Sequence, residues 1–140
     1  MELSQKTDDA LRVLLHLGER PDHACTIWEI SRAHDISHLR LTAVVADLVR
    51  ADILHQAQDR SGSVHLVKAP DDIVLSDIVR LSETGLERSD CTRCRIRSDC
   101  VLRAALAGAR QAFLDALSTI SLHDVLLSDQ GDPPCFHRTG

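Results

Sequence analysis

Three of the five cysteines lie within ten residues, and they are the side chains best suited to chemistry. Cys91, Cys94 and Cys100 follow the spacing Cys-x2-Cys-x5-Cys, whereas Cys25 and Cys135 stand apart. Thiolates bind iron and zinc and react with oxidants. An odd number of cysteines makes a poor disulfide framework, and we expect a cytoplasmic chain because no secretory signal is recognisable. The cysteine spacing therefore predicts metal or redox chemistry.

The residue types alone leave three forms of that chemistry open. Structural zinc sites prefer four protein ligands, often from two Cys-x2-Cys pairs, and this segment has only one pair. Iron–sulfur clusters also accept three cysteines with a different fourth ligand. Cations that could offset the charge of such a site surround the cysteines: Arg88, Arg93, Arg95, Arg97 and Arg103. The residues favour an iron–sulfur cluster, with a zinc site and a bare thiol sensor as alternatives.

The first seventy residues have the pattern of a DNA-reading domain. A helix with an apolar face ends near Gly18, a capping box at Thr26 opens a short helix over 27–34, and Ser37 opens a helix over 38–51. Apolar residues then alternate on both sides of a turn at 58–62, which predicts a β-hairpin. We therefore predict a mainly α fold with a small β wing, the winged helix-turn-helix plan.

That plan assigns candidate DNA contacts by position. The second helix of a helix-turn-helix presents its first residues to the major groove, and a wing reaches the backbone or the minor groove. The guanidinium of Arg40 would match two acceptors of guanine. The predicted DNA-binding residues are Ser37, His38, Arg40, Thr42, Arg60 and Ser61.

The rest of the chain predicts a dimer. After the winged domain (1–83) come the cysteine loop (84–100), a long helix (101–129) with a last short turn from Ser121, and a tail (130–140) that we expect to be disordered. Apolar residues on the long helix step by four and three, as in a helix-pairing seam: Leu102, Leu106, Ala109, Phe113, Ala116 and Ile120. Such a seam needs a covering surface, and a second copy is the economical one.

Composition excludes several classes of function. The chain has 140 residues, 16 basic and 21 acidic side chains and 2% aromatic residues. So few aromatics argue against stacking of single-stranded bases, and the net charge of −5 argues against loose, charge-driven DNA binding. No apolar run is long enough to span a membrane, and no phosphate loop or catalytic constellation is recognisable. We predict no membrane association and no enzymatic activity.

The cysteine loop and the helix after it resemble a family of bacterial iron–sulfur transcription regulators, the IscR/NsrR/RirA family. The resemblance rests on Cys94-Arg-Ile-Arg-Ser-Asp-Cys100-Val-Leu, on Ala112-Phe113-Leu114, on Ser121-Leu122-His123-Asp124-Val125 and on the opening Leu3 to Arg12. It covers nearly the whole chain and is strongest for the nitric-oxide-sensing branch. It implies a homodimeric repressor that binds an operator in double-stranded DNA.

The resemblance also implies a ligand set. In the nitric-oxide-sensing branch an aspartate of the first helix of the other subunit is the fourth ligand, and Asp8 stands at that place. Cys91, Cys94, Cys100 and Asp8 would then hold a [4Fe-4S] cluster, or a [2Fe-2S] cluster, that senses nitric oxide or redox state. An iron-responsive regulator of the RirA type, a zinc-stabilised winged-helix interaction module and a cluster protein without DNA binding remain alternatives.

Overall fold

The computed structural model describes residues 2–20, 22, 24–86 and 100–128 of the chain. Its helices are α1 (Gln5–Gly18), α2 (Ile27–His34), α3 (His38–Arg50), α4 (Leu75–Ser82), α5 (Val101–Ser118) and α6 (Leu122–Ser128), with a 3-10 turn, η1 (Pro70–Asp72), before α4. The strands β1 (Ala24–Thr26), β2 (Leu54–Gln56) and β3 (Ser63–Leu66) form an antiparallel sheet in the order β1-β3-β2. The predicted fold class, mainly α with a small β wing, is confirmed.

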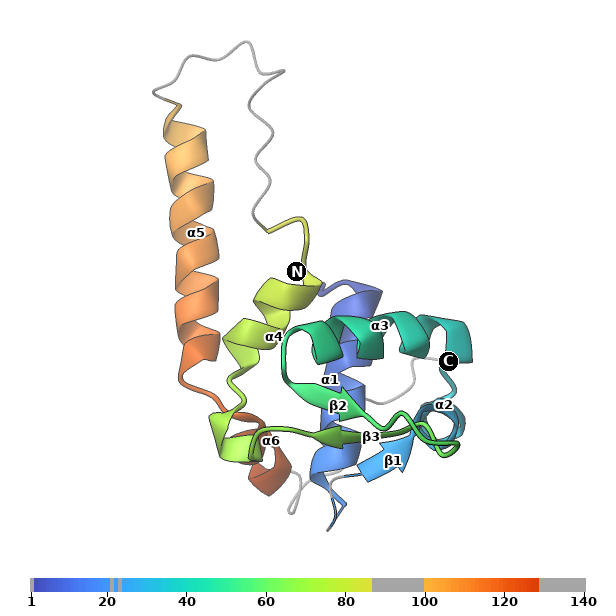
Figure 1. Cartoon of the computed structure of the whole chain (residues 1–140). Helices are drawn as coiled ribbons and strands as arrows, with labels where there is room; N and C mark the ends of the chain where they lie inside the picture. The colour runs from blue at the N-terminus through green and yellow to red at the C-terminus, as the bar shows by residue number, and fades with distance from the viewer. Residues whose placement is uncertain (1, 21, 23, 87–99, 129–140) are drawn as a thin grey trace.

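Helix α1 is the centre of the core. Figure 1 shows it in the middle of the body, and it packs against α3, α4 and α6. Its apolar side chains Val13, Leu14 and Leu17 are fully buried. The helix begins at Ser4, whose hydroxyl accepts a hydrogen bond from the Thr7 amide. Residues placed on α1 are therefore held firmly relative to three other helices.

The helix-turn-helix forms as its caps predict. The Thr26 hydroxyl and the Glu29 carboxylate make the reciprocal capping box that opens α2. Asp35 ends α2 in the left-handed conformation, with φ of 54°, and Ser37 caps α3 by accepting a hydrogen bond from the Arg40 amide. The stripe of α3 that faces the core is the predicted one: Leu41, Val44, Val45 and Leu48.

The wing has one strand more than the sequence analysis expects. The predicted hairpin is present as β2 and β3, and β1 pairs with β3 through Cys25 opposite Val64. Three residues are too short for an alternating pattern to be recognised. Cys25 is buried, as expected for a small apolar residue. Burial and a hydrogen bond to Glu29 raise the pKa of its thiol to about 11, so it stays protonated and is a poor metal ligand.

The C-terminal segment differs from a single dimerisation helix with a final turn. The chain breaks after α5, and the Ser121 hydroxyl accepts a hydrogen bond from the Asp124 amide, which opens the separate helix α6. The Leu122 side chain is fully buried and Leu126 contacts Gly18 of α1, so α6 belongs to the core. Ile120 lies at the break, where its carbonyl accepts a hydrogen bond from the Leu75 amide. Its place in the helix-pairing seam was therefore wrong.

Loss of the Leu122 side chain should destabilise the chain. We expect Leu122→Ala to lower the free energy of unfolding by about 2–5 kcal/mol, because it leaves a cavity where α6 meets α1. Leu127→Ala is the matched control on the same helix, since Leu127 is 57% exposed, and should change it by less than about 0.5 kcal/mol. Denaturant unfolding measures both values, and equal values would contradict the docking of α6.

Two histidines meet between α1 and α2. The ring nitrogens His16 Nδ1 and His34 Nε2 lie 3.2 Å apart, and the rings pack edge to face. Burial lowers the pKa of both imidazoles below 6.5; Arg20 adds to the effect at His16, and His16 and Arg12 add to it at His34. The folded state therefore favours the neutral form of both rings.

This histidine pair should make stability fall in mild acid. Above about pH 7 both imidazoles are neutral in the folded and in the unfolded chain. As the pH drops through 6.5, the unfolded chain binds protons on these imidazoles more readily than the folded chain does. The free energy of unfolding therefore decreases. We expect a falling free energy of unfolding below pH 6.5, measured by urea unfolding at several pH values. The double variant His16→Gln/His34→Gln should flatten that slope, and an unchanged slope would show that other groups cause it.

Candidate nucleic-acid interface and cluster ligands

The first turn of α3 presents polar groups to solvent. Ser37, His38 and Thr42 are exposed. The Ser37 hydroxyl is occupied as the helix cap, and the Thr42 hydroxyl donates to the His38 carbonyl at 2.8 Å. The Thr42 oxygen also lies 3.4 Å from His38 Nδ1, and both side chains remain exposed at this end of the helix. This is the part of a helix-turn-helix that enters a major groove.

Arg40 has a partner that the sequence analysis missed. Its guanidinium donates to the Asp9 carboxylate, with Nε 3.0 Å from Oδ2 and Nη2 2.7 Å from Oδ1. The Asp9 side chain is only 2% exposed, whereas the Arg40 side chain is 47% exposed. In this structure the guanidinium predicted to read guanine therefore binds a buried carboxylate of α1. Asp9 lies four residues before the buried Val13, a position at which an acid needs a partner.

The wing turn carries an exposed cation. Arg60 is exposed and makes no ion pair within the described residues. The Asp59 carboxylate accepts hydrogen bonds from the Ser61 amide at 2.9 Å, from the Ser61 hydroxyl and from the Gly62 amide. Gly62 adopts a positive φ of 57°, which a glycine accommodates without strain. Ser61 thus takes part in the hydrogen bonds of this turn, and the Arg60 side chain is exposed to solvent.

Two further exposed features of the helix-turn-helix were missed. Leu39 is 82% exposed on the first turn of α3. Trp28 is 57% exposed on α2, and the Arg32 guanidinium lies 4.7 Å from the centre of its ring. The spacing of Trp28 and Arg32, four residues on one helix, is the available sequence signal for this pair.

The cluster ligands are described only in part. Cys91 and Cys94 lie outside the described residues. Cys100 is half-buried at the N-cap of α5, and Asp8 lies in the first turn of α1, where its carboxylate is 3.0 Å from Arg12 Nε. Within the described residues no three His, Cys, Asp or Glu side chains converge as a metal site.

Helix α5 holds Cys100 away from the body. Figure 1 shows α5 rising past α4 so that its first half projects beyond the body. Arg110 donates a hydrogen bond to the Leu86 carbonyl, so the middle of α5 lies beside the start of the cysteine loop. At 1.5 Å per residue, Cys100 is about 15 Å farther along the helix axis. The apolar residues of this half, Leu102 and Leu106 among them, are exposed.

A hydrogen-bond network links the start of α1 to the end of α4. The Glu83 carboxylate accepts hydrogen bonds from the Thr7 hydroxyl and the Ser4 amide, both at 2.5 Å. Partial burial alone would raise the pKa of Glu83, but these hydrogen bonds lower it overall. The residues that flank the cysteine loop and those that flank Asp8 are thus held together within one chain.

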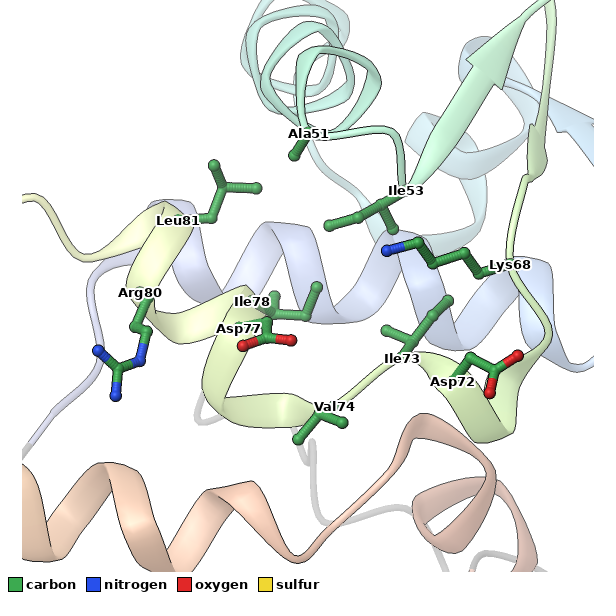
Figure 2. Close-up of a pocket in the computed structure, with 10 residues that line it drawn as sticks. All are labelled: Ala51, Ile53, Lys68, Asp72, Ile73, Val74, Asp77, Ile78, Arg80 and Leu81. Carbon is green, nitrogen blue, oxygen red and sulfur yellow. The ribbon is translucent and has the colours of Figure 1, made fainter.

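A shallow hollow of about 370 Å³ lies between α4, η1 and the end of α3. Figure 2 shows Asp77 beside Ile78, the Lys68 side chain extending toward Ile53, and Arg80 pointing away. Among the described residues, neither the predicted DNA-binding residues nor Asp8 and Cys100 line it. The hollow therefore does not form part of the candidate site.

Comparison with known proteins identifies the family. Residues 3–128 match the family model Rrf2, described as "Iron-dependent Transcriptional regulator". The chain belongs to the Rrf2 family. It is thus a transcriptional regulator, and the prediction that it is not an enzyme is confirmed by the regulators it matches. Within the described residues, no helix is both long and apolar enough to cross a bilayer.

The similarity to several known proteins extends over almost the full length of the chain. It is 35% identical over 132 residues to the HTH-type transcriptional regulator NsrR of Geobacillus kaustophilus (90% of each chain) and 30% identical over 135 residues to that of Halalkalibacterium halodurans (92% of each). Among solved structures, CymR of B. subtilis (20% identity, TM-score 0.73, 91% and 98% covered) and T. potens IscR (20%, 0.73, 96% and 93%) share the fold.

Loss of the wing cation should weaken DNA binding uniformly. We expect Arg60→Gln to reduce affinity for specific and non-specific duplexes alike and to lower the slope of log affinity against log salt by about one. Fluorescence anisotropy with a labelled duplex, selected from a random-sequence pool by the wild-type chain, measures this. Arg50→Gln is the control, because Arg50 already pairs with Asp47. An unchanged salt slope for Arg60→Gln would remove the wing from the interface.

Proposed function

We propose that this Rrf2 regulator is a homodimeric, cytoplasmic repressor whose affinity for operator DNA is controlled by an iron–sulfur cluster that senses nitric oxide or redox state. The observation that carries the proposal is the match to regulators named NsrR over about 90% of both chains, in a sequence that holds Cys91, Cys94, Cys100 and Asp8. The first turn of α3 and the wing residue Arg60 would contact the DNA.

The described ligands suit such a cluster. Cys100 stands at the N-cap position of α5, where the helix dipole favours an anionic sulfur. The Asp8 carboxylate lies at the surface, with a side chain 27% exposed, so it can reach a ligand without unfolding α1. Three thiolates with one carboxylate form a set with one weak ligand, which suits an iron–sulfur sensor better than a structural zinc site.

The geometry favours a site shared between two copies. Cys100 lies at the projecting end of α5, whereas Asp8 belongs to α1 in the body of the same chain. A second copy packed on the exposed apolar side chains of α5 would bring its own α1 toward that end. We therefore assign Asp8 of the partner subunit, rather than of the same subunit, as the fourth ligand.

The residues of the chain then act as a link between ligand and DNA. A bound cluster would supply a centre that nitric oxide and oxidants attack. The cluster would be bound on one side by three thiolates, those of Cys91, Cys94 and Cys100. On the other side it would be bound by the Asp8 carboxylate, which belongs to α1. Because α1 packs on α3, the position of Asp8 influences the helix that enters the groove. A useful response needs a difference of a few kcal/mol in DNA affinity between the two states.

Metal analysis after purification without oxygen is the first test. We expect iron and acid-labile sulfide in matching amounts, and their loss in Cys100→Ser. Zinc without sulfide would favour the zinc-stabilised interaction module, and three free thiols without metal would favour a thiol sensor. Either result would overturn the proposed cluster. The iron-responsive regulator would be indicated if an iron chelator removed the bound iron and nitric oxide at physiological concentration did not.

A mixed dimer tests the shared site. One chain carries Asp8→Ala and keeps the three cysteines; the other carries Cys100→Ser and keeps Asp8. If Asp8 acts across the dimer, the mixture contains one complete ligand set and should recover wild-type cluster stability and nitric oxide response in about half of the sites. If Asp8 acts within its own chain, no complete set exists, and the mixed dimer should respond like the Asp8→Ala homodimer.

A further inference from the structure

Leu39 is an apolar side chain that the fold leaves exposed on α3, the recognition helix of the helix-turn-helix. It is 82% exposed and lies two residues after the cap Ser37, whereas the stripe that faces the core begins at Leu41. A single exposed leucine is common on protein surfaces. The position of Leu39 is what matters, because the first turn of this helix is the part that enters a major groove.

Two more exposed residues share the face of Leu39. Thr42 and Ala43 follow it by three and four residues, and both spacings place side chains next to one another on a helix. The Thr42 hydroxyl donates to the His38 carbonyl at 2.8 Å, which leaves the Thr42 methyl group for an apolar contact. Leu39, Thr42 and Ala43, here called the outer apolar face of α3, therefore offer carbon atoms rather than charges to an approaching surface.

Polar side chains beside this face are engaged within the chain. The Ser37 hydroxyl accepts a hydrogen bond from the Arg40 amide as the helix cap, and the Arg40 guanidinium donates to the Asp9 carboxylate. His38 keeps an exposed imidazole, whose Nδ1 lies 3.4 Å from the Thr42 oxygen. Apolar contact is therefore the mode of base recognition for which this turn is best equipped.

Thymine is the base that presents an apolar group in the major groove. Its C5-methyl group lies there, whereas the other base edges are distinguished by hydrogen-bond donors and acceptors. Alanine and the methyl group of threonine are side-chain groups that suit the thymine methyl group. A phosphate would be a poor partner, because the three side chains of the outer apolar face carry no charge.

We propose that Leu39 is a specificity-determining residue that packs against the C5-methyl group of a pyrimidine in the major groove, with Thr42 and Ala43 beside the contact. Because the group recognised is the methyl group, 5-methylcytosine satisfies the contact as thymine does. The inference rests on the proposed function in so far as α3 binds duplex DNA, and it names the chemical group that the helix reads. It depends on neither the cluster nor the cluster ligands.

Replacement of thymine by deoxyuridine tests the contact, because it removes the methyl group and keeps the base-pairing atoms. The full chain, purified without oxygen, is titrated by fluorescence anisotropy against a labelled duplex that it selects from a random-sequence pool. Copies of the duplex carry deoxyuridine in place of one thymine at a time. We expect the affinity to fall about three- to fivefold at one thymine of each half-site, the effect of one buried methyl group. No loss at any position would overturn the proposal.

5-Methylcytosine separates the methyl group from the rest of the base. At the sensitive position, a cytosine–guanine pair and a 5-methylcytosine–guanine pair differ only in that group. The methylated duplex should bind about three- to fivefold more tightly. Equal affinities would show that the deoxyuridine effect arises from the shape of the DNA rather than from a contact, and the proposal would fail.

Leu39→Ala assigns the effect to this side chain. The variant should unfold at the same denaturant concentration as the wild type, because Leu39 is exposed and alanine favours helices. It should bind the thymine duplex about as weakly as the wild type binds the deoxyuridine duplex, and deoxyuridine should then cost it little more. An undiminished deoxyuridine effect in Leu39→Ala would assign the methyl contact to another residue and overturn the proposal.

Leu127→Ala is the matched control for these titrations. It makes the same change at another exposed leucine, which lies on α6 outside the helix-turn-helix. This variant should keep the full deoxyuridine effect. If the effect disappeared in both variants, it would not be specific to the recognition helix, and the proposal would be wrong.

The outcomes separate this inference from the proposed function and from a different partner. A chain that holds a cluster and binds duplexes without a Leu39-dependent thymine effect would overturn the inference alone, whereas a chain that enriches no duplex would overturn both. A chain without iron that shows the effect would keep the inference and lose the cluster. If Leu39→Ala kept the deoxyuridine effect and lowered the particle mass in solution, Leu39 would pack against a second copy instead of DNA.

Discussion

Helix α1 can be buried only if other helices cover it on several sides, and this constraint organises the chain. The covering helices are α3, α4 and α6. They belong to the helix-turn-helix, to the segment before the cysteine loop and to the C-terminal segment, respectively. The side chains of α1 that face these helices, Val13, Leu14 and Leu17, are completely inaccessible to solvent. A displacement of α1 must therefore be shared with the recognition helix, because close-packed interiors transmit strain rather than absorb it.

Ion pairs add direction to this packing. Lys6 of α1 pairs with Asp47 near the end of α3, and Asp9 of α1 pairs with Arg40 at the start of α3. Ion pairs therefore join α1 to both ends of the second helix of the helix-turn-helix. The chain as a whole is acidic, with a net charge of −5. Attraction to DNA must then come from a few placed cations; among the predicted DNA contacts, Arg40 is paired with Asp9 and Arg60 is exposed.

Local chemistry explains why most of the fold could be predicted from the sequence. The caps at Thr26 and Ser37, the apolar stripe of α3 and the alternation on both sides of the wing turn each depend on residues close together in the chain, and each is present in the structure. The partner of Arg40 could not be predicted, because Asp9 is 31 residues away and its burial depends on tertiary packing. The strand β1 was too short to give a pattern, and the break before α6 depends on a cap that competes with a continuous helix. The arrangement of Cys91 and Cys94 lies outside the described residues, so their part in the candidate site stays a prediction.

The single tryptophan stands on the outer surface of α2, beneath the guanidinium of Arg32 and apart from the buried core. The emission of an indole in that position is sensitive to the solvent and to charges around the helix-turn-helix. The sequence contains no second tryptophan whose emission would overlap with it. The molecule therefore carries a built-in optical reporter whose signal originates from one helix. Changes in solvent or charge around α2 can be followed by the emission of Trp28, without attaching a label to a cysteine.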